Sequence, residues 1–165
     1  MNAKPTEPKL SHVDADNQPT MVDVADKAVT QRTAHARARV QLPAAVRTAI
    51  DGDEIRGPKG PVFQTAIVAG TQAAKKTHEL VPFCHPLGLE GCKISISLDA
   101  AGDAIVDCRV KVTHKTGVEM EALTGATVAA LTIYDMCKAL SHDIVITDVA
   151  LVEKTGGKSD YRSGA

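Results

Sequence analysis

The 165-residue chain is poor in aromatic residues, with no tryptophan, two tyrosines and two phenylalanines. An aromatic platform for stacking nucleic-acid bases is therefore not expected. The net charge is also small, because 19 Lys and Arg residues nearly balance 20 Asp and Glu residues. The overall charge therefore gives no general attraction to nucleic acid or to an anionic membrane. The core must be built from aliphatic side chains, and we expect small alanine-rich faces to let helices pack closely on a sheet.

The four cysteines are widely spaced and lack the CxxC pairs of a structural zinc site. We interpret them as reduced thiols of the core. No segment approaches the apolar length of a membrane span, and the N-terminal residues carry no signal-sequence pattern. We therefore expect a cytoplasmic protein whose length suffices for one domain without a metal or disulfide staple.

The N-terminal part of the sequence differs in composition from the rest. Residues 1–20 contain three prolines and no hydrophobic periodicity, which predicts a disordered N-terminal tail. We expect residues 21–160 to form the single domain and residues 161–165 to form a flexible C-terminus.

Alternating apolar residues predict four strands. Residues 34–42 alternate strictly between Ala, Val or Leu on one face and His, Arg or Gln on the other, which is typical of a half-buried strand. Residues 92–98 and 106–112 alternate in the same way on either side of a short turn and predict a hairpin. The last strand is expected over residues 143–152.

Helical spacing predicts the segments between these strands. A short helix follows Pro43 and carries Val46 and Ile50, a second spans residues 61–77, and the longest spans residues 118–140. The predicted order is strand-helix-helix-strand-strand-helix-strand. This order is typical of an α+β ferredoxin-like sandwich, in which helices cover one face of a four-stranded antiparallel sheet.

Two prolines bracket a loop over residues 82–86, where an interior helix is excluded because each proline removes a backbone donor. His85 in this loop could act as an acid, a base or a phosphate donor, and a capping or packing role is equally consistent with the sequence. Cys84 could be a nucleophile. Adjacent side chains of an extended loop point in opposite directions, however, which disfavours a Cys84–His85 dyad.

Asp135 and Lys138 lie three residues apart on the long helix and share a face, so each can change the other's protonation. Such a pair is commonly a surface salt bridge. The alternative is a functional pair. Tyr134 and Met136 flank Asp135 and favour the partly buried setting that such a role needs.

Lysines recur beside glycine turns at Lys59, Lys115, Lys154 and Lys158. A cluster of such side chains would suit a polyphosphate, although lysines in loops are mostly only solvated.

Glu119 and Glu121 begin the long helix, where a carboxylate is favoured by the helix dipole. Glu121 and Asp135 are about 21 Å apart on a straight helix, so one chain can hardly direct both at the same atom. If two long helices pair in an antiparallel two-fold dimer, the glutamates of one chain can approach Asp135 and Lys138 of the other.

Three segments together resemble the family of cyclic pyranopterin monophosphate synthases, the molybdenum cofactor biosynthesis protein C family: KTGVEMEALTGATVAALTIYDMCKAL, PFCHPLGL and KTGGKS. The resemblance extends from Met21 through the KTGGKS segment. Phe83, His114 and Pro61 depart from the leucine, glycine and aspartate that are more usual in the family at these positions.

The resemblance implies a lyase that converts 3′,8-cyclo-7,8-dihydroguanosine 5′-triphosphate to cyclic pyranopterin monophosphate and pyrophosphate. It implies that Asp135 and Lys138 are catalytic. It further implies that the residues binding the substrate are Lys59, Phe83, Cys84, His85, Glu119, Met120, Glu121 and Lys154. With aromatic residues so scarce, we expect the purine-derived ring to be held mainly by polar contacts and aliphatic surface.

The same resemblance implies a ferredoxin-like catalytic domain over residues 21–160, assembled as a hexamer of three dimers with sites at a dimer interface. The reaction has no net redox step, so no flavin, nicotinamide or iron–sulfur cofactor is implied; magnesium accompanying the triphosphate stays open. A non-catalytic binding module and a family enzyme with another substrate are the alternatives, because a fold alone implies no function.

Overall fold

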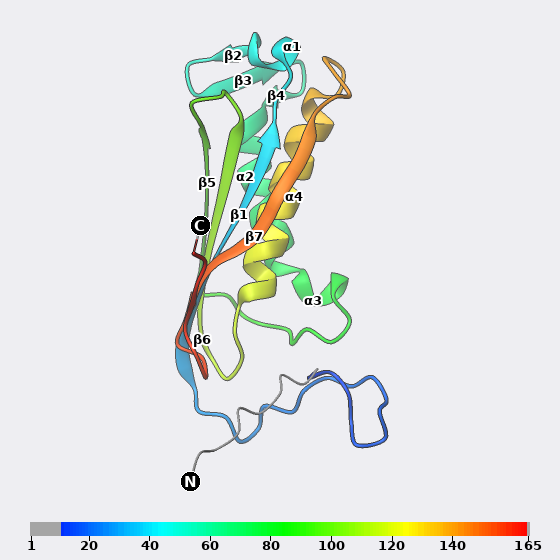
Figure 1. The fold of residues 1–165 in the computed structure, drawn as a ribbon, viewed down its shortest axis with the longest axis vertical. Helices are drawn as coiled ribbons and strands as arrows, with labels where there is room; N and C mark the ends of the chain where they lie inside the picture. Colours follow the sequence, from blue (N-terminus) through cyan, green and yellow to red (C-terminus); the bar gives the residue numbers. More distant parts are fainter. Residues whose placement is uncertain (1–10, 165) are drawn as a thin grey trace.

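The computed structural model describes residues 11–164 (Figure 1). Residues 1–10 of the predicted tail and residue 165 lie outside the described part. The fold is α+β, and its main layer is an antiparallel sheet of five strands. In spatial order these are β5 (Gly91–Leu98), β6 (Ala104–His114), β1 (Thr30–Gln41), β7 (Val145–Thr155) and β8 (Tyr161–Arg162).

Two long helices, α2 (Val62–Lys75) and α4 (Glu119–Cys137), run along this sheet (Figure 1). α4 packs on β1, β6 and β7, and α2 packs on β5 and on α4. A smaller sheet precedes α2, and two helices of four residues complete the fold. These shorter elements are α1 (Ala44–Arg47), β2 (Ile50–Asp51), β3 (Glu54–Gly57), β4 (Gly60–Pro61) and α3 (Thr77–Leu80).

The predicted strand count was wrong, because β8 adds a fifth strand at the edge of the main sheet. Arg162 pairs with Glu153 of β7. The small sheet and α3 also fall between the predicted elements, and Ile50 begins β2 instead of continuing the helix after Pro43. Two to four residues are too few to show a hydrophobic period, so these pieces form only through pairing with longer neighbours.

The alternation predicted for β1 is confirmed by burial. Its apolar face is 0–3% exposed and consists of Ala34, Ala36, Ala38 and Val40, and Leu42 directly after the strand is buried as well. The opposite face is less open than expected, since His35 is only 8% exposed. Its imidazole pairs with the carboxylate of Asp107 on β6, which also accepts two hydrogen bonds from Arg37.

Glycines allow α2 and α4 to cross closely. A Cβ added at Gly70 would lie 2.6 Å from the carbonyl oxygen of Gly125, and a Cβ added at Gly125 would lie 2.7 Å from the Cys108 sulfur. Both distances are shorter than van der Waals contact. Glycine at these two positions therefore lets α4 lie close to α2 on one side and to Cys108 of β6 on the other, which holds α4 in a defined position.

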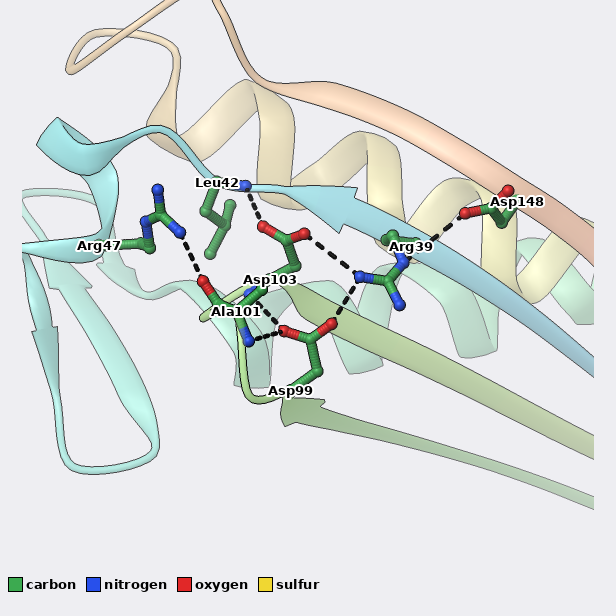
Figure 2. Close-up of polar contacts among 7 residues, drawn as sticks. All are labelled: Arg39, Leu42, Arg47, Asp99, Ala101, Asp103 and Asp148. Atoms are coloured by element: carbon green, nitrogen blue, oxygen red, sulfur yellow. Dashed lines mark hydrogen bonds and ion pairs between the residues drawn. The ribbon is translucent and has the colours of Figure 1, made fainter.

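Polar contacts join three strands at one end of the main sheet (Figure 2). The Arg39 guanidinium on β1 donates hydrogen bonds to Asp99 and Asp103 of the β5–β6 turn, at 2.5 and 3.3 Å. It also lies 3.6 Å from Asp148 of β7, which adopts a left-handed φ of 52°. The other oxygen of Asp103 accepts the Leu42 N–H at 3.0 Å. This network stabilises the end of the sheet adjoining α1.

Candidate functional site

The first group of predicted residues lies at the C-terminal end of α4. The Lys138 ammonium donates a hydrogen bond of 2.7 Å to Asp135, and Lys59 lies 3.7 Å from the other Asp135 oxygen. The Lys138 hydrogen bond, followed by the charges of Lys138 and Lys59, lowers the pKa of Asp135. Asp135 in turn raises the pKa of Lys138. Both groups are therefore ionised at neutral pH.

This cluster is more open than the sequence predicts. The side chains of Asp135 and Lys138 are 54% and 47% exposed, and both line a shallow cavity with Leu131 and Tyr134. An open acid–base pair on one protomer leaves room for a ligand or for a second chain.

Lys59 reaches this cluster from the turn of the β3–β4 hairpin. Glu54, the first residue of β3, anchors that hairpin: its carboxylate accepts the backbone N–H groups of Phe63 at 2.8 Å and Gln64 at 3.2 Å. These donors belong to the first turn of α2, whose N-cap residue Pro61 supplies no side-chain cap. A buried carboxylate thus caps α2 and holds the base of the hairpin that carries Lys59.

The second group lies at the opposite end of α4. Lys154 on β7 pairs with Glu119 at 3.0 Å. An added Cβ at Gly117 would meet the Glu119 carboxylate, so the Glu119 side chain lies directly over this turn. The KTGGKS segment is also constrained: Gly156 has a φ of 81°, and a Cβ there would collide with the Gln31 carbonyl oxygen.

A small cavity of about 190 Å³ beside this pair is lined by cationic side chains; we call it the cationic pocket. Its basic residues are Lys27, Arg32, Lys115, Lys154 and Lys158. Arg32 donates a hydrogen bond of 3.3 Å to the Lys115 carbonyl, while its buried Nε has no partner among the described residues.

Sequence reasoning missed Lys27 and Arg32. Neither stands beside a glycine turn or in the three segments quoted for the family resemblance, and isolated basic residues are ordinary on a surface. Only the pairing of β1 with β6 and β7 brings Arg32 beside Lys115 and Lys154.

A larger cavity of about 500 Å³ adjoins the first turn of α4; we call it the apolar pocket. It brings together six of the predicted substrate-binding residues, Phe83, Cys84, His85, Glu119, Met120 and Glu121. It shares four lining residues with the cationic pocket, Lys27, Thr116, Gly117 and Glu119. The two pockets are therefore neighbours.

Glu121 is the buried acid of the apolar pocket, with 3% of the residue exposed. One carboxylate oxygen lies 3.4 Å from the Cys84 sulfur, and the other has no hydrogen-bond partner within residues 11–164. Burial raises the pKa of Glu121. Burial and the charge of Glu121 raise the pKa of Cys84 to about 12, so this thiol stays protonated and is not an activated nucleophile.

The two groups of site residues are separated along α4. Glu121 and Asp135 are separated by about 21 Å of helix, and Figure 1 shows the small sheet at one end of α4 and α3 near the other. One chain therefore holds Lys59, Asp135 and Lys138 apart from the two pockets.

Among residues 11–164, no cluster of three His, Cys, Asp or Glu side chains is arranged to hold a metal ion. Within the same range, no helix combines the length and the apolar character that crossing a membrane requires.

Comparison with known proteins gives consistent matches over most of the chain. Residues 21–157 match the profile of the MoaC family. A Xanthomonas axonopodis pv. citri protein named cyclic pyranopterin monophosphate synthase is 54% identical over 162 residues, covering 97% of each chain. The protein of that name from Xanthomonas campestris strain B100 is 53% identical over 160 residues. The molybdenum cofactor biosynthesis bifunctional protein of Synechocystis is 51% identical over 155 residues, which cover 92% of this chain and 45% of that protein.

Proposed function

The chain belongs to the MoaC family, and on that basis we propose that it is an enzyme of molybdenum cofactor biosynthesis, a cyclic pyranopterin monophosphate synthase. The proposed reaction converts 3′,8-cyclo-7,8-dihydroguanosine 5′-triphosphate to cyclic pyranopterin monophosphate and pyrophosphate. Identity above half over nearly the whole of both chains supports this proposal.

The chemical character of the two adjoining pockets also supports the proposed function. The substrate joins an anionic triphosphate to a purine-derived ring that carries N–H donors. The cationic pocket suits the triphosphate, and the apolar pocket suits the ring, with the Glu121 carboxyl as an acceptor for its N–H groups. Because Lys27 and Glu119 line both pockets, one ligand can occupy them together. This continuity is the structural observation that best supports the proposal.

The reaction requires proton transfers and neutralisation of phosphate charge. A hydroxyl oxygen bonds to the α-phosphorus, the bond from that phosphorus to pyrophosphate breaks, and the hydroxyl proton passes to a base. The purine-derived ring must also be rearranged, which requires further proton transfers. We assign the acid–base work at the core of the substrate to Asp135 and Lys138, whose opposite charges fit an acceptor and a donor of protons. Lys59, His85 and Lys154 would offset charge on the triphosphate and on departing pyrophosphate.

Since the two groups lie at opposite ends of α4, we propose that each complete site forms between two protomers. An antiparallel pair of α4 helices would place Asp135 and Lys138 of one chain beside Glu119 and Glu121 of the other. Leu131, 54% exposed beside the Asp135 cavity, supports a contact at this surface. The proposed assembly is a hexamer of three such dimers.

Two further features accompany this proposal. The four long strands lie in the order β5, β6, β1 and β7 with α2 and α4 packed along them, an arrangement that supports a ferredoxin-like sandwich with a two-residue strand added. All four cysteines are free thiols, which fits the reducing cytoplasm.

The test is to incubate the purified protein with the cyclic triphosphate and to follow pyrophosphate and pterin formation. Wild type should form both products, Asp135→Asn and Lys138→Ala should lose most activity, and Lys93→Ala, an exposed lysine of β5, should retain it. Binding without turnover by wild type would instead support a non-catalytic binding module. Unimpaired Asp135 and Lys138 variants would refute the residue assignment.

Mixing inactive variants tests the shared site. Asp135→Asn and Glu121→Ala protomers each carry one defective group, so mixed dimers contain one site with both groups intact. Random exchange of equal amounts makes about half of the dimers mixed, and each mixed dimer has one intact site of two, so about a quarter of the activity should return. No recovery despite demonstrated exchange would place the complete site within one chain.

A further inference from the structure

The N-terminal segment contributes to the apolar pocket. Ser11 and His12 line it, although both belong to the part of the sequence predicted to be a tail. The His12 imidazole stacks on the Phe83 ring with centroids 6.1 Å apart and an angle of 21° between the planes. This distance lies within the range of favourable ring pairs, about 4.5–7 Å.

Local hydrogen bonds hold His12 at this place. The Thr20 N–H donates to the His12 carbonyl at 3.0 Å, and Val13 pairs with Pro19. The Asp14 carboxylate accepts backbone N–H groups within the loop between them, including that of Gln18 at 2.8 Å. Residues 12–20 thus form a closed loop that presents the His12 ring to Phe83.

The two rings lie in the pocket that also contains the buried Glu121 carboxyl. One Glu121 oxygen has no partner in the part of the chain that the structure describes, so the pocket offers a free acceptor as well as a ring surface. A flat heterocycle with N–H groups along one edge satisfies both features. The volume of about 500 Å³ accommodates a bicyclic ring and its sugar.

We propose that His12 is a further substrate-binding residue, which together with Phe83 forms a two-ring wall against which the purine-derived ring packs. The inference rests on the proposed function for the identity of the ring. It assigns a ring contact to a segment outside the region that carries the family resemblance, and it adds an aromatic surface to a pocket expected to be mainly polar and aliphatic.

Two probes separate ring binding from phosphate binding: GTP, which carries a purine ring, and inorganic tripolyphosphate, which does not. Calorimetric titration of the full-length protein should show GTP binding about tenfold weaker for His12→Ala, the scale of one lost ring contact. Tripolyphosphate affinity should stay unchanged. His12→Phe preserves a ring and should restore GTP binding. Gln18→Ala changes the same loop without touching the pocket and should bind both probes as wild type does.

A Phe83→Ala variant should show the same selective loss. The double variant with His12→Ala should lose less than the product of the single effects, because the two rings form one surface. The inference is overturned if wild type does not bind GTP, if His12→Ala binds GTP as wild type does, or if both probes weaken equally. Failure of the proposed function would be a separate result, namely absence of pterin product from wild type.

Discussion

Removing the Glu54 carboxylate should destabilise the protein and uncouple Lys59 from Asp135. Glu54 is 8% exposed and accepts three backbone hydrogen bonds, one from its neighbour Ile55 and two from the first turn of α2. Glu54→Ala leaves the N–H group of buried Phe63 and that of the more exposed Gln64 without this acceptor.

The size of the effect follows from these bonds. A buried N–H left unpaired costs about 1–3 kcal/mol, and loss of a helix cap costs about 0.5–2 kcal/mol. Since the two figures describe partly the same bonds, we expect a loss of about 2–4 kcal/mol in the free energy of unfolding. For a chain of this size that corresponds to a Tm lower by about 4–16 °C. Glu54→Gln keeps one acceptor oxygen and should lie between.

Thermal unfolding followed by circular dichroism measures the stability, and pyrophosphate release well below Tm measures the function. Glu79→Ala is the matched control: Glu79 is exposed, pairs only with Lys76 at 3.6 Å, and should change stability by about 0.5 kcal/mol at most. For Glu54→Ala, kcat should fall more than the unfolded fraction explains, because the hairpin carrying Lys59 loses its anchor. A Tm equal to that of wild type would refute the capping role.

Three further predictions concern a turn and two buried acids. Gly156→Ala should lower stability by about 1–3 kcal/mol in thermal unfolding, because the new Cβ meets the Gln31 carbonyl at a φ of 81°; an unchanged Tm would contradict this. Burial raises the pKa of Glu121, so its stabilising contribution is present below the ordinary Glu pKa and is lost as pH rises through the raised one. Urea unfolding at several pH values measures this dependence of stability on pH. Glu121→Gln should remove it and should be no less stable than wild type above neutrality. If the stability of the variant changes with pH in parallel with that of wild type, the role of Glu121 is refuted. Burial opposes ionisation of Asp107, but hydrogen bonds from Arg37 and His35 lower its pKa in the folded protein. The contribution of Asp107 to stability is therefore present above the pKa of the unfolded state and is lost as pH falls through the lowered pKa of the folded state. Asp107→Asn should be about 2 kcal/mol less stable near neutral pH, with the difference vanishing in acid, and a difference that persists in acid would exclude the ionic origin.

The sequence alone was sufficient for the long elements. Strict alternation over 34–42 predicted the buried face of β1, and helical spacing predicted α2 and α4 within a few residues. These signals are local, since side chains two or three to four residues apart share a face whatever the rest of the chain does. The three motifs that begin PFCHP, KTGVEME and KTGGKS likewise identified the family from the sequence alone.

Contacts between distant segments were decided only by the tertiary structure. β8 and the small sheet exist because longer strands offer backbone partners, and no hydrophobic period marks them. Lys59 meets Asp135, and Arg32 meets Lys115, across long stretches of chain. Such meetings depend on strand register, on the close crossing of α2 and α4, and on the Glu54 cap. None of these is a property of the residues within one turn of helix or one stretch of strand, which is why local patterns named most site residues but could not group them.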